Sequence, residues 1–329
     1  MKAHIHHFLV LATTLASATL LAAKDDNQGT YTDPAKVDAD YAVQGEYTGK
    51  LDGGKSGAHL IALGDAKFDL VIYPGGLPGD GWDGKKDKRI KASGATADGV
   101  TTFKLETRTA TLKDGKLTIQ KQPLGDVVGS FERTVRKSPT LGKKPPEGAV
   151  VLFDGSNLDA WKDGAKMTAD KLLEQGVTSK QEFQDFQIHI EFRTPYKPKA
   201  RGQGRGNSGF YAHGRYEVQI LDSFGLEGEH NECGGVYSTQ PPLVNMCYPP
   251  LTWQTYDIDF TAAKFDAQGK KTDNAKISVK QNGVETHKET VCDHATTASP
   301  KKEGPQPGPI YFQNHGNPVR FQNLWVLPK

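Results

Sequence analysis

Short segments in which polar and apolar side chains alternate recur along most of the chain, and glycine-containing turns separate them. Alternation at a period of two places successive side chains on opposite faces of an extended strand, whereas a helix needs an apolar period near 3.6 residues. The pair Asn282-Gly283 lies between two such segments and is a strong signal for a tight hairpin. Only Ala169 to Gln175 looks helical. The sequence therefore predicts an all-β protein.

A change in composition divides the chain into two β regions. Residues 138–147 are rich in proline, glycine and lysine and interrupt the alternating pattern, as a linker does. Because a chain of this length exceeds a typical single core, we expect two domains. The predicted small antiparallel β domain, a barrel or a sandwich with an accessory role, covers residues 31–137. A jelly-roll sandwich is predicted over residues 148–329.

The N-terminus predicts export. Residues 1–23 combine an early lysine, a short apolar run and small residues before a charged segment, which is typical of a cleaved secretory signal peptide. We therefore expect cleavage near Ala23 and a periplasmic or secreted protein with no membrane span. The formal net charge of +2 argues against a dedicated nucleic-acid partner. The sequence does not define the oligomeric state.

The chain has three cysteines, and an oxidising compartment would allow one disulfide bond. Cys233 and Cys247 are the preferred pair because the proline-containing segment between them resembles a loop that a bridge would fasten. Cys292 is the alternative partner.

Two predicted strands carry a polar face. In residues 207–223, Glu217 and Gln219 point one way while Val218 and Ile220 point the other. Near the C-terminus, residues 310–315 alternate in the same manner, and their polar members are Tyr311, Gln313 and His315. Carboxylate, amide, imidazole and phenol groups on one surface suit a polyhydroxylated ligand such as a sugar. The alternative is an ordinary solvated sheet face.

Several motifs in the second half of the chain resemble one bacterial family. They are VLFDGSNLDAW, NSGFY, GRYEVQILDS, CGGVY and GPIYFQNHGNPVRFQNLWV. In this order they are similar to the domain of unknown function 1080, whose members are described as 3-keto-disaccharide hydrolases or 3-keto-glucoside lyases and hydratases. The resemblance covers about residues 147–329. It implies a concanavalin-like jelly roll whose concave sheet carries the sugar site.

The resemblance also implies a reaction class. A ketone at C3 of a sugar acidifies the hydrogen on C2, so a base can remove that hydrogen while the C1 substituent leaves and water later adds. Such a site needs a base, an acid and a donor near the ketone oxygen. The candidate catalytic residues are Glu217, His315, Asp222 and His213. The candidate substrate-binding residues are Asn207, Tyr211, Arg215, Gln219, Tyr237 and Gln313.

Each catalytic candidate also has a structural interpretation. Glu217 could pair with an arginine across the sheet, His315 could fasten a loop, and Asp222 could form a turn. His213 precedes a glycine and is a weaker candidate. His230 and Glu232, with a nearby carboxylate, could help to bind a divalent metal, but their spacing matches no dedicated zinc motif, and a solvated loop is the alternative. We therefore assign no metal ligand and no definite cofactor.

Two other functions fit the same strands. Glu217, Gln219 and Asp222 are spaced like the acidic strand of retaining jelly-roll glucanases, although two of the three positions are altered. A retaining mechanism needs two carboxyl groups about 5 to 5.5 Å apart. A lectin-like module without catalysis needs only amide and aromatic groups, for which Trp253 and Tyr256 are candidates. Substrate tests separate the three functions. A 3-keto-glycoside hydrolase would turn over only 3-keto glycosides, a glucanase would turn over ordinary glucans, and a lectin would bind sugars without turnover.

Overall fold

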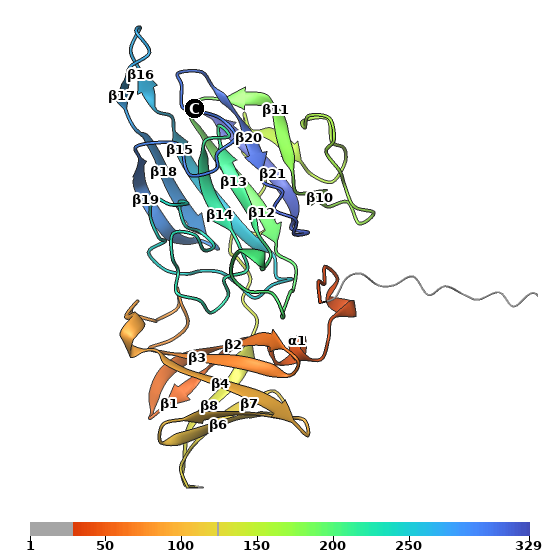
Figure 1. Cartoon of the computed structure of the whole chain (residues 1–329), viewed down its shortest axis with the longest axis vertical. Coiled ribbons are helices and arrows are strands. Elements are labelled where there is room, and N and C mark those ends of the chain that lie inside the picture. The colour runs from red at the N-terminus through yellow and green to blue at the C-terminus, as the bar shows by residue number, and fades with distance from the viewer. Residues whose placement is uncertain (1–28, 124) are drawn as a thin grey trace, which may run out of the picture.

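The computed structural model describes residues 29–123 and 125–329, which form two β units stacked along the long axis (Figure 1). The predicted signal peptide at residues 1–23 lies outside the described residues. Among the described residues, no helix is both long and apolar enough to cross a membrane. The predicted all-β fold is confirmed. The described helical segments are short: η1 (Pro34–Lys36), α1 (Asp40–Val43), η2 (Lys86–Lys88) and η3 (Gly202–Gly204).

The N-terminal unit is a closed antiparallel barrel in which each strand pairs with the next and β8 pairs with β1. Its strands are β1 (Gly45–Leu51), β2 (Gly54–Gly64), β3 (Lys67–Pro74), β4 (Ile90–Ala97), β5 (Val100–Leu105), β6 (Arg108–Lys113), β7 (Lys116–Lys121) and β8 (Val127–Thr134). Large apolar side chains such as Phe68, Phe103 and Phe131 fill the interior. Closure leaves no unpaired sheet edge, which is one way in which a small β unit avoids aggregation.

The C-terminal unit is a sandwich of two antiparallel sheets. The larger sheet contains β10 (Leu173–Glu174), β21 (Arg320–Pro328), β12 (Phe186–Arg193), β15 (Gln254–Thr261), β18 (Ala275–Gln281) and β19 (Val284–Cys292) in spatial order, with β9 (Val150–Phe153) also paired to β21. The smaller sheet has the order β11 (Val177–Phe183), β20 (Gly308–Phe312), β13 (Ser208–Ala212) and β14 (Tyr216–Ile220). A separate hairpin joins β16 (Lys264–Phe265) to β17 (Lys271–Asp273).

The core of the sandwich lies between the two sheets and contains Val218, Ile220 and Phe312 from the smaller sheet. The predicted Asn282-Gly283 hairpin is confirmed, since both residues have positive φ, at 51° and 80°, and connect β18 to β19. The helix suggested by Ala169 to Gln175 is not formed. That segment is a turn followed by β10, because Leu173 is buried and pairs with β21.

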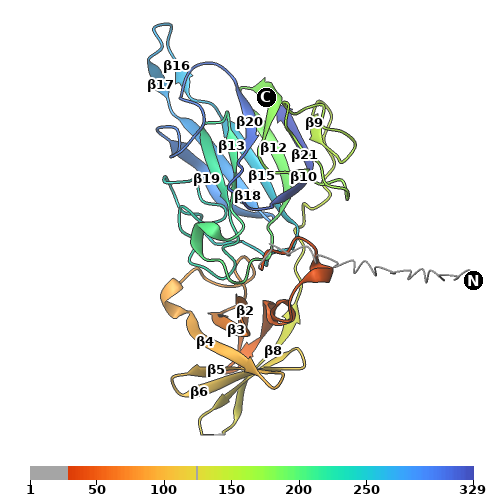
Figure 2. The same ribbon diagram turned by 45° about the vertical axis from the view of Figure 1, so that its right-hand side comes forward.

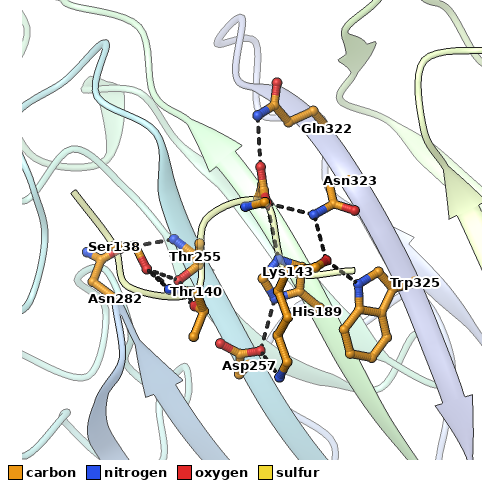
Figure 3. A network of polar contacts seen from close by, with 12 residues as sticks. Ser138, Thr140, Lys143, His189, Thr255, Asp257, Asn282, Gln322, Asn323 and Trp325 are labelled. Carbon is orange, nitrogen blue, oxygen red and sulfur yellow. Dashed lines mark hydrogen bonds and ion pairs between the residues drawn. The ribbon is translucent and has the colours of Figure 1, made fainter. Parts of the chain in front are cut away.

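The predicted linker crosses the outer face of the larger sheet, where its backbone is held by side chains (Figure 3). Gly142 N donates to Glu191 Oε1 at 2.5 Å. The carbonyl oxygen of Lys143 accepts hydrogen bonds from Asn323 Nδ2 at 3.0 Å and from Trp325 Nε1 at 3.1 Å. The segment is therefore attached to the sandwich rather than free in solvent.

A buried histidine lies under this segment with a carboxylate at each ring nitrogen. His189 Nδ1 is 2.9 Å from Asp257 Oδ1, and His189 Nε2 is 3.3 Å from Glu191 Oε1. The Trp325 ring stacks on the imidazole, and Lys143 Nζ lies 2.9 Å from Asp257 Oδ1. Burial alone would raise the pKa of Asp257, but its partners His189 and Lys143 lower it to about 2. Because both ring nitrogens of His189 already have carboxylate partners, neither is free to act on a ligand. The cluster is therefore suited to a structural role, which is to hold the linker.

This cluster predicts acid-sensitive stability. A carboxyl group whose pKa is lower in the folded state than in the unfolded chain stabilises the fold above the unfolded pKa, and the effect is lost as the pH falls through the folded pKa. Asp257→Asn should therefore lower the free energy of unfolding at pH 6 by about 2 kcal/mol, and by less at pH 3. Urea unfolding followed by tryptophan fluorescence measures both values. Asp259→Asn, at an exposed carboxylate on the same strand, is the matched control. An equal loss in both variants would contradict the prediction.

Candidate active site

The polar face expected from the sequence is the outer face of the smaller sheet. In the β13–β14 pair, Tyr211 lies opposite Glu217 and Gly209 lies opposite Gln219. Tyr311 of β20 continues the row beside Tyr211. Because neighbouring residues of β14 pack into the sandwich core, Glu217 and Gln219 must point away from it.

Glu217 is the most unusual ionisable group on this face. It is only 2% exposed, and its Oε2 accepts a hydrogen bond from the Tyr211 hydroxyl at 2.7 Å. Gln313 Nε2 donates to the Tyr211 oxygen at 3.2 Å, which orients the phenol proton toward the carboxylate. Burial raises the pKa of Glu217 to about 8, and the bond from Tyr211 opposes this rise. A carboxyl group with such a pKa can act as a proton donor or acceptor near neutral pH.

The glycine of the Asn-Ser-Gly motif makes room for this carboxylate. A Cβ atom at position 209 would lie 2.1 Å from Glu217 Oε1, which is too close for any other residue to fit without a shift. Loops hold the backbone of Glu217 on both sides: its N–H donates to Thr296 Oγ1 at 3.0 Å, and its carbonyl accepts from Tyr237 N at 3.1 Å. The candidate base is therefore fixed by its surroundings.

Beside Glu217, two side-chain amides donate to one carbonyl oxygen. Gln203 Oε1 accepts hydrogen bonds from Asn207 Nδ2 at 2.8 Å and from Gln219 Nε2 at 3.1 Å. Gln203 Nε2 donates in turn to the carbonyl oxygen of Asn231 at 2.8 Å. The Oδ1 atom of Asn207 is buried and has no hydrogen-bond partner among the described residues. The two amide groups can bind a ketone or hydroxyl oxygen of a ligand when the Gln203 side chain moves out of this position.

Sequence reasoning missed Gln203, Asn231 and Thr296. The segment around Gln203 forms the short turn η3, whose glutamine side chain reaches the polar face. Loop residues carry no periodic signal, so no pattern in the sequence connects them to β14.

The structure places His213 and Arg215 away from this cluster, at the turn between β13 and β14. His213 Nε2 lies 2.8 Å from the Gln184 carbonyl oxygen, and its ring packs against Phe260. Burial lowers the pKa of His213 to about 4, so the ring is neutral near pH 7 and donates this hydrogen bond. Arg215 donates to His213 Nδ1 at 3.2 Å and to the carbonyl oxygens of Gly304 and Gln306. Both side chains hold the turn and a neighbouring loop.

Asp222 and His315 also lie outside the hydrogen-bonded cluster. Asp222 is buried and accepts a hydrogen bond from Arg205 Nε at 2.7 Å, while Arg205 also bonds to the Ala62 carbonyl in the barrel. Burial raises the pKa of Asp222, and Arg205 opposes the rise. His315 is exposed in the loop after β20, where its carbonyl oxygen accepts from Asn317.

The predicted disulfide bond is not formed, because the three cysteines are buried free thiols. The Cys233 sulfur contacts the Tyr256 hydroxyl at 3.2 Å and accepts a hydrogen bond from Gln281 at 3.3 Å. Cys247 donates to the Leu221 carbonyl at 3.4 Å. The thiols of Cys233 and Cys247 also lie within hydrogen-bonding reach of each other, so the structure brings the predicted pair together without joining it. Tyr256 is fully buried and donates to the Gln219 carbonyl, so it offers no stacking surface.

The residues considered for a metal do not converge. Glu232 accepts hydrogen bonds from the N–H groups of Gly228 and Glu229 in its own loop, and the His230 ring lies against that of Tyr237. Over residues 29–123 and 125–329, no three histidine, cysteine, aspartate or glutamate side chains gather as metal ligands would.

The part of the chain that resembles known proteins is the sandwich. Residues 148–327 match the family described as the 3-keto-alpha-glucoside-1,2-lyase-like domain. A solved "putative glycosyl hydrolase" from Parabacteroides distasonis ATCC 8503 is 33% identical over 56% of this chain and 85% of its own, with a TM-score of 0.52. Another protein of the same name and organism is 19% identical over 56% of this chain and 94% of its own, with a TM-score of 0.42. No curated protein matches the chain.

The geometry of the site predicts an observable titration. With 13C-carboxyl-labelled glutamate, one NMR resonance should titrate near pH 8 and should be absent from Glu217→Gln. In Tyr211→Phe this titration should move to higher pH, because a hydrogen bond that favours the ionised form is lost. Tyr311→Phe removes a neighbouring phenol and should leave the titration where it is. A Glu217 resonance that titrates below pH 6 would contradict the assignment.

Proposed function

Because this chain belongs to the 3-keto-alpha-glucoside-1,2-lyase-like domain family, we propose that it is a carbohydrate-active enzyme that cleaves 3-keto glycosides. The proposed reaction is elimination across C1 and C2, followed by hydration, so that the net result is hydrolysis. The observation that carries this proposal is the buried Glu217 carboxyl group, with a pKa of about 8, beside two amide donors that share one oxygen acceptor.

Elimination from a 3-keto sugar needs a base more than it needs a nucleophile. The base removes the proton at C2, the C1–C2 double bond forms, and the bond from C1 to the aglycone oxygen breaks. The departing oxygen takes a proton from an acid or from water. In hydration, water adds at C1 and a proton returns to C2, which restores the ketone and completes the balance.

Glu217 is proposed as the base. A carboxylate with a conjugate-acid pKa near 8 is a stronger base than an ordinary glutamate, although only about a tenth of it is ionised at pH 7. Tyr211 and Gln313 form a donor chain that ends at the Glu217 carboxylate and orients it. The Asn207 and Gln219 amides, which now bind the Gln203 oxygen, are proposed to bind the C3 oxygen as negative charge develops on it.

Two alternative functions have less support. A retaining glucanase would need Asp222 as the second carboxylate, yet that group is paired with Arg205 and lines a cavity that faces the barrel. A lectin needs no buried carboxyl group, and burying one without a cationic partner is costly. Export to the periplasm or beyond remains a proposal that rests on residues 1–23.

Removing the base should abolish turnover while preserving the fold. Glu217→Gln keeps the size of the side chain and should lower kcat on a 3-keto glucoside at least about a hundredfold. In the wild-type enzyme, kcat/KM should rise with pH through about 8, because the base acts in its ionised form. His315→Ala and Asp222→Asn are the comparison variants. If Glu217→Gln kept near-normal turnover while His315→Ala or Asp222→Asn lost most of it, the residue changed in the inactive variant would be the catalytic one.

Isotope incorporation distinguishes elimination from direct displacement. Reaction in heavy water should give a sugar product that carries deuterium at C2, because the proton removed there is replaced from solvent during hydration. Mass spectrometry and proton NMR at early conversion measure the label. Free 3-keto glucose incubated without enzyme corrects for spontaneous exchange. Product formed with no deuterium at C2 beyond this correction would count against elimination.

A further inference from the structure

The barrel lies outside the residues that match the family, and nothing in that match gives it a role. Both views of the molecule show β2 and β3 on the side of the barrel next to the sandwich (Figures 1 and 2). Between the two units lies a cavity of about 550 Å³. Its walls come from β2, β3 and β4 of the barrel and, on the sandwich, from residues 201–205 and from the loop that follows β14.

The polar side chains around this cavity already have partners within the protein. Ser93 donates to Asp69 at 2.6 Å. Glu227 of the sandwich accepts from both Arg89 and Lys91 of the barrel, and Arg205 is paired with Asp222. Arg201 and Glu232 are likewise bonded, to backbone carbonyl and N–H groups respectively.

Because the charges are paired within the protein, the larger part of the surface left for a ligand is apolar. It comes from Ile61, Leu63 and Val71 on the barrel and from Phe224 and Leu226 on the sandwich loops. A ligand that offered further charge would have to break existing ion pairs, whereas a flat apolar group would gain from burial. The cavity therefore suits an aromatic or similarly apolar group.

The cavity shares two loops with the candidate active site. Gly202 and Glu232 line it, and their sequence neighbours Gln203 and Asn231 form the hydrogen bonds that connect to Gln219. The η3 turn and the loop that contains Asn231 and Glu232 thus contribute both to the cavity wall and to the polar cluster. A glycoside whose C3 oxygen replaced the Gln203 oxygen would displace the Gln203 side chain or this turn, and its C1 substituent could then extend toward the cavity.

We propose that the cavity between barrel and sandwich binds the aglycone of the 3-keto glycoside, and that the aglycone is aromatic or similarly apolar. The barrel then supplies one wall of the substrate site and contributes to specificity. This inference rests on the proposed function of the sandwich.

Filling the cavity should change specificity rather than chemistry. In Ser93→Trp a bulky side chain on β4 replaces a small residue of the cavity wall, and Leu226→Trp does so from the opposite wall. Both should lower kcat/KM for 4-nitrophenyl 3-keto-α-glucoside at least about tenfold and change that for methyl 3-keto-α-glucoside less than about twofold. Ser130→Trp on β8, across the barrel from β4, is the matched control. Equal effects on both substrates, or no effect from either cavity variant, would overturn the inference.

A binding measurement tests the cavity separately from catalysis. Calorimetry with unoxidised 4-nitrophenyl and methyl α-glucosides should show that the wild-type protein prefers the aromatic glycoside, and that Ser93→Trp loses the preference while Ser130→Trp keeps it. This result would support the cavity even if neither 3-keto substrate were turned over, in which case only the proposed function would fail. Equal affinity for the two glycosides, or binding of neither, would count against the cavity.

Discussion

The burial of one carboxyl group on the outer face of the smaller sheet is the constraint on which the site depends. A glutamate in a low-dielectric environment favours its neutral form, and Glu217 has one phenol donor and no cationic partner among its described hydrogen bonds and ion pairs. Burying such a residue costs free energy, and the rest of the fold must hold its surroundings in place. The structure fixes them through Gly209, which leaves the necessary space, and through Thr296 and Tyr237, which hold the backbone of Glu217.

A second cluster of ionisable groups shows why composition alone does not identify a catalytic site. His189, Asp257 and Glu191 contain the groups of an acid–base site and lie on the outer face of the larger sheet, where His189 and Glu191 are buried and Asp257 is partly buried. There, each carboxylate faces a histidine nitrogen, and the linker covers the group (Figure 3). The resulting ion pairs lower the pKa of Asp257 and raise that of His189, which favours charged forms in stable pairs. At Glu217 burial dominates and leaves a proton that can be exchanged.

The alternation of polar and apolar residues in the sequence predicted the features that depend on strand geometry. Alternation along β14 placed Glu217 and Gln219 on one face, and the Asn282-Gly283 pair placed a hairpin. Contacts made by loops could not be read in this way. Gln203 is separated from Gln219 by sixteen positions of sequence and by a change of direction, and its role depends on where η3 lies. The loop between Cys233 and Cys247 indicated that these two thiols lie together, which they do, but it did not reveal that they remain unjoined.

The turn that carries Gln203 connects the chemistry of the sandwich to the barrel. On one side of it, Arg201 donates to the Leu63 carbonyl at 2.9 Å, and on the other Arg205 donates to the Ala62 carbonyl at 3.2 Å. Both acceptors belong to β2, so one barrel strand holds both ends of η3. Because the Gln203 side chain occupies the oxygen position shared by the Asn207 and Gln219 amides, a ligand oxygen can reach that position only if this side chain rotates away or the turn moves against these contacts. The barrel thereby influences access to the amide donors as well as forming a wall of the neighbouring cavity, and a sandwich lacking the barrel would lose both constraints.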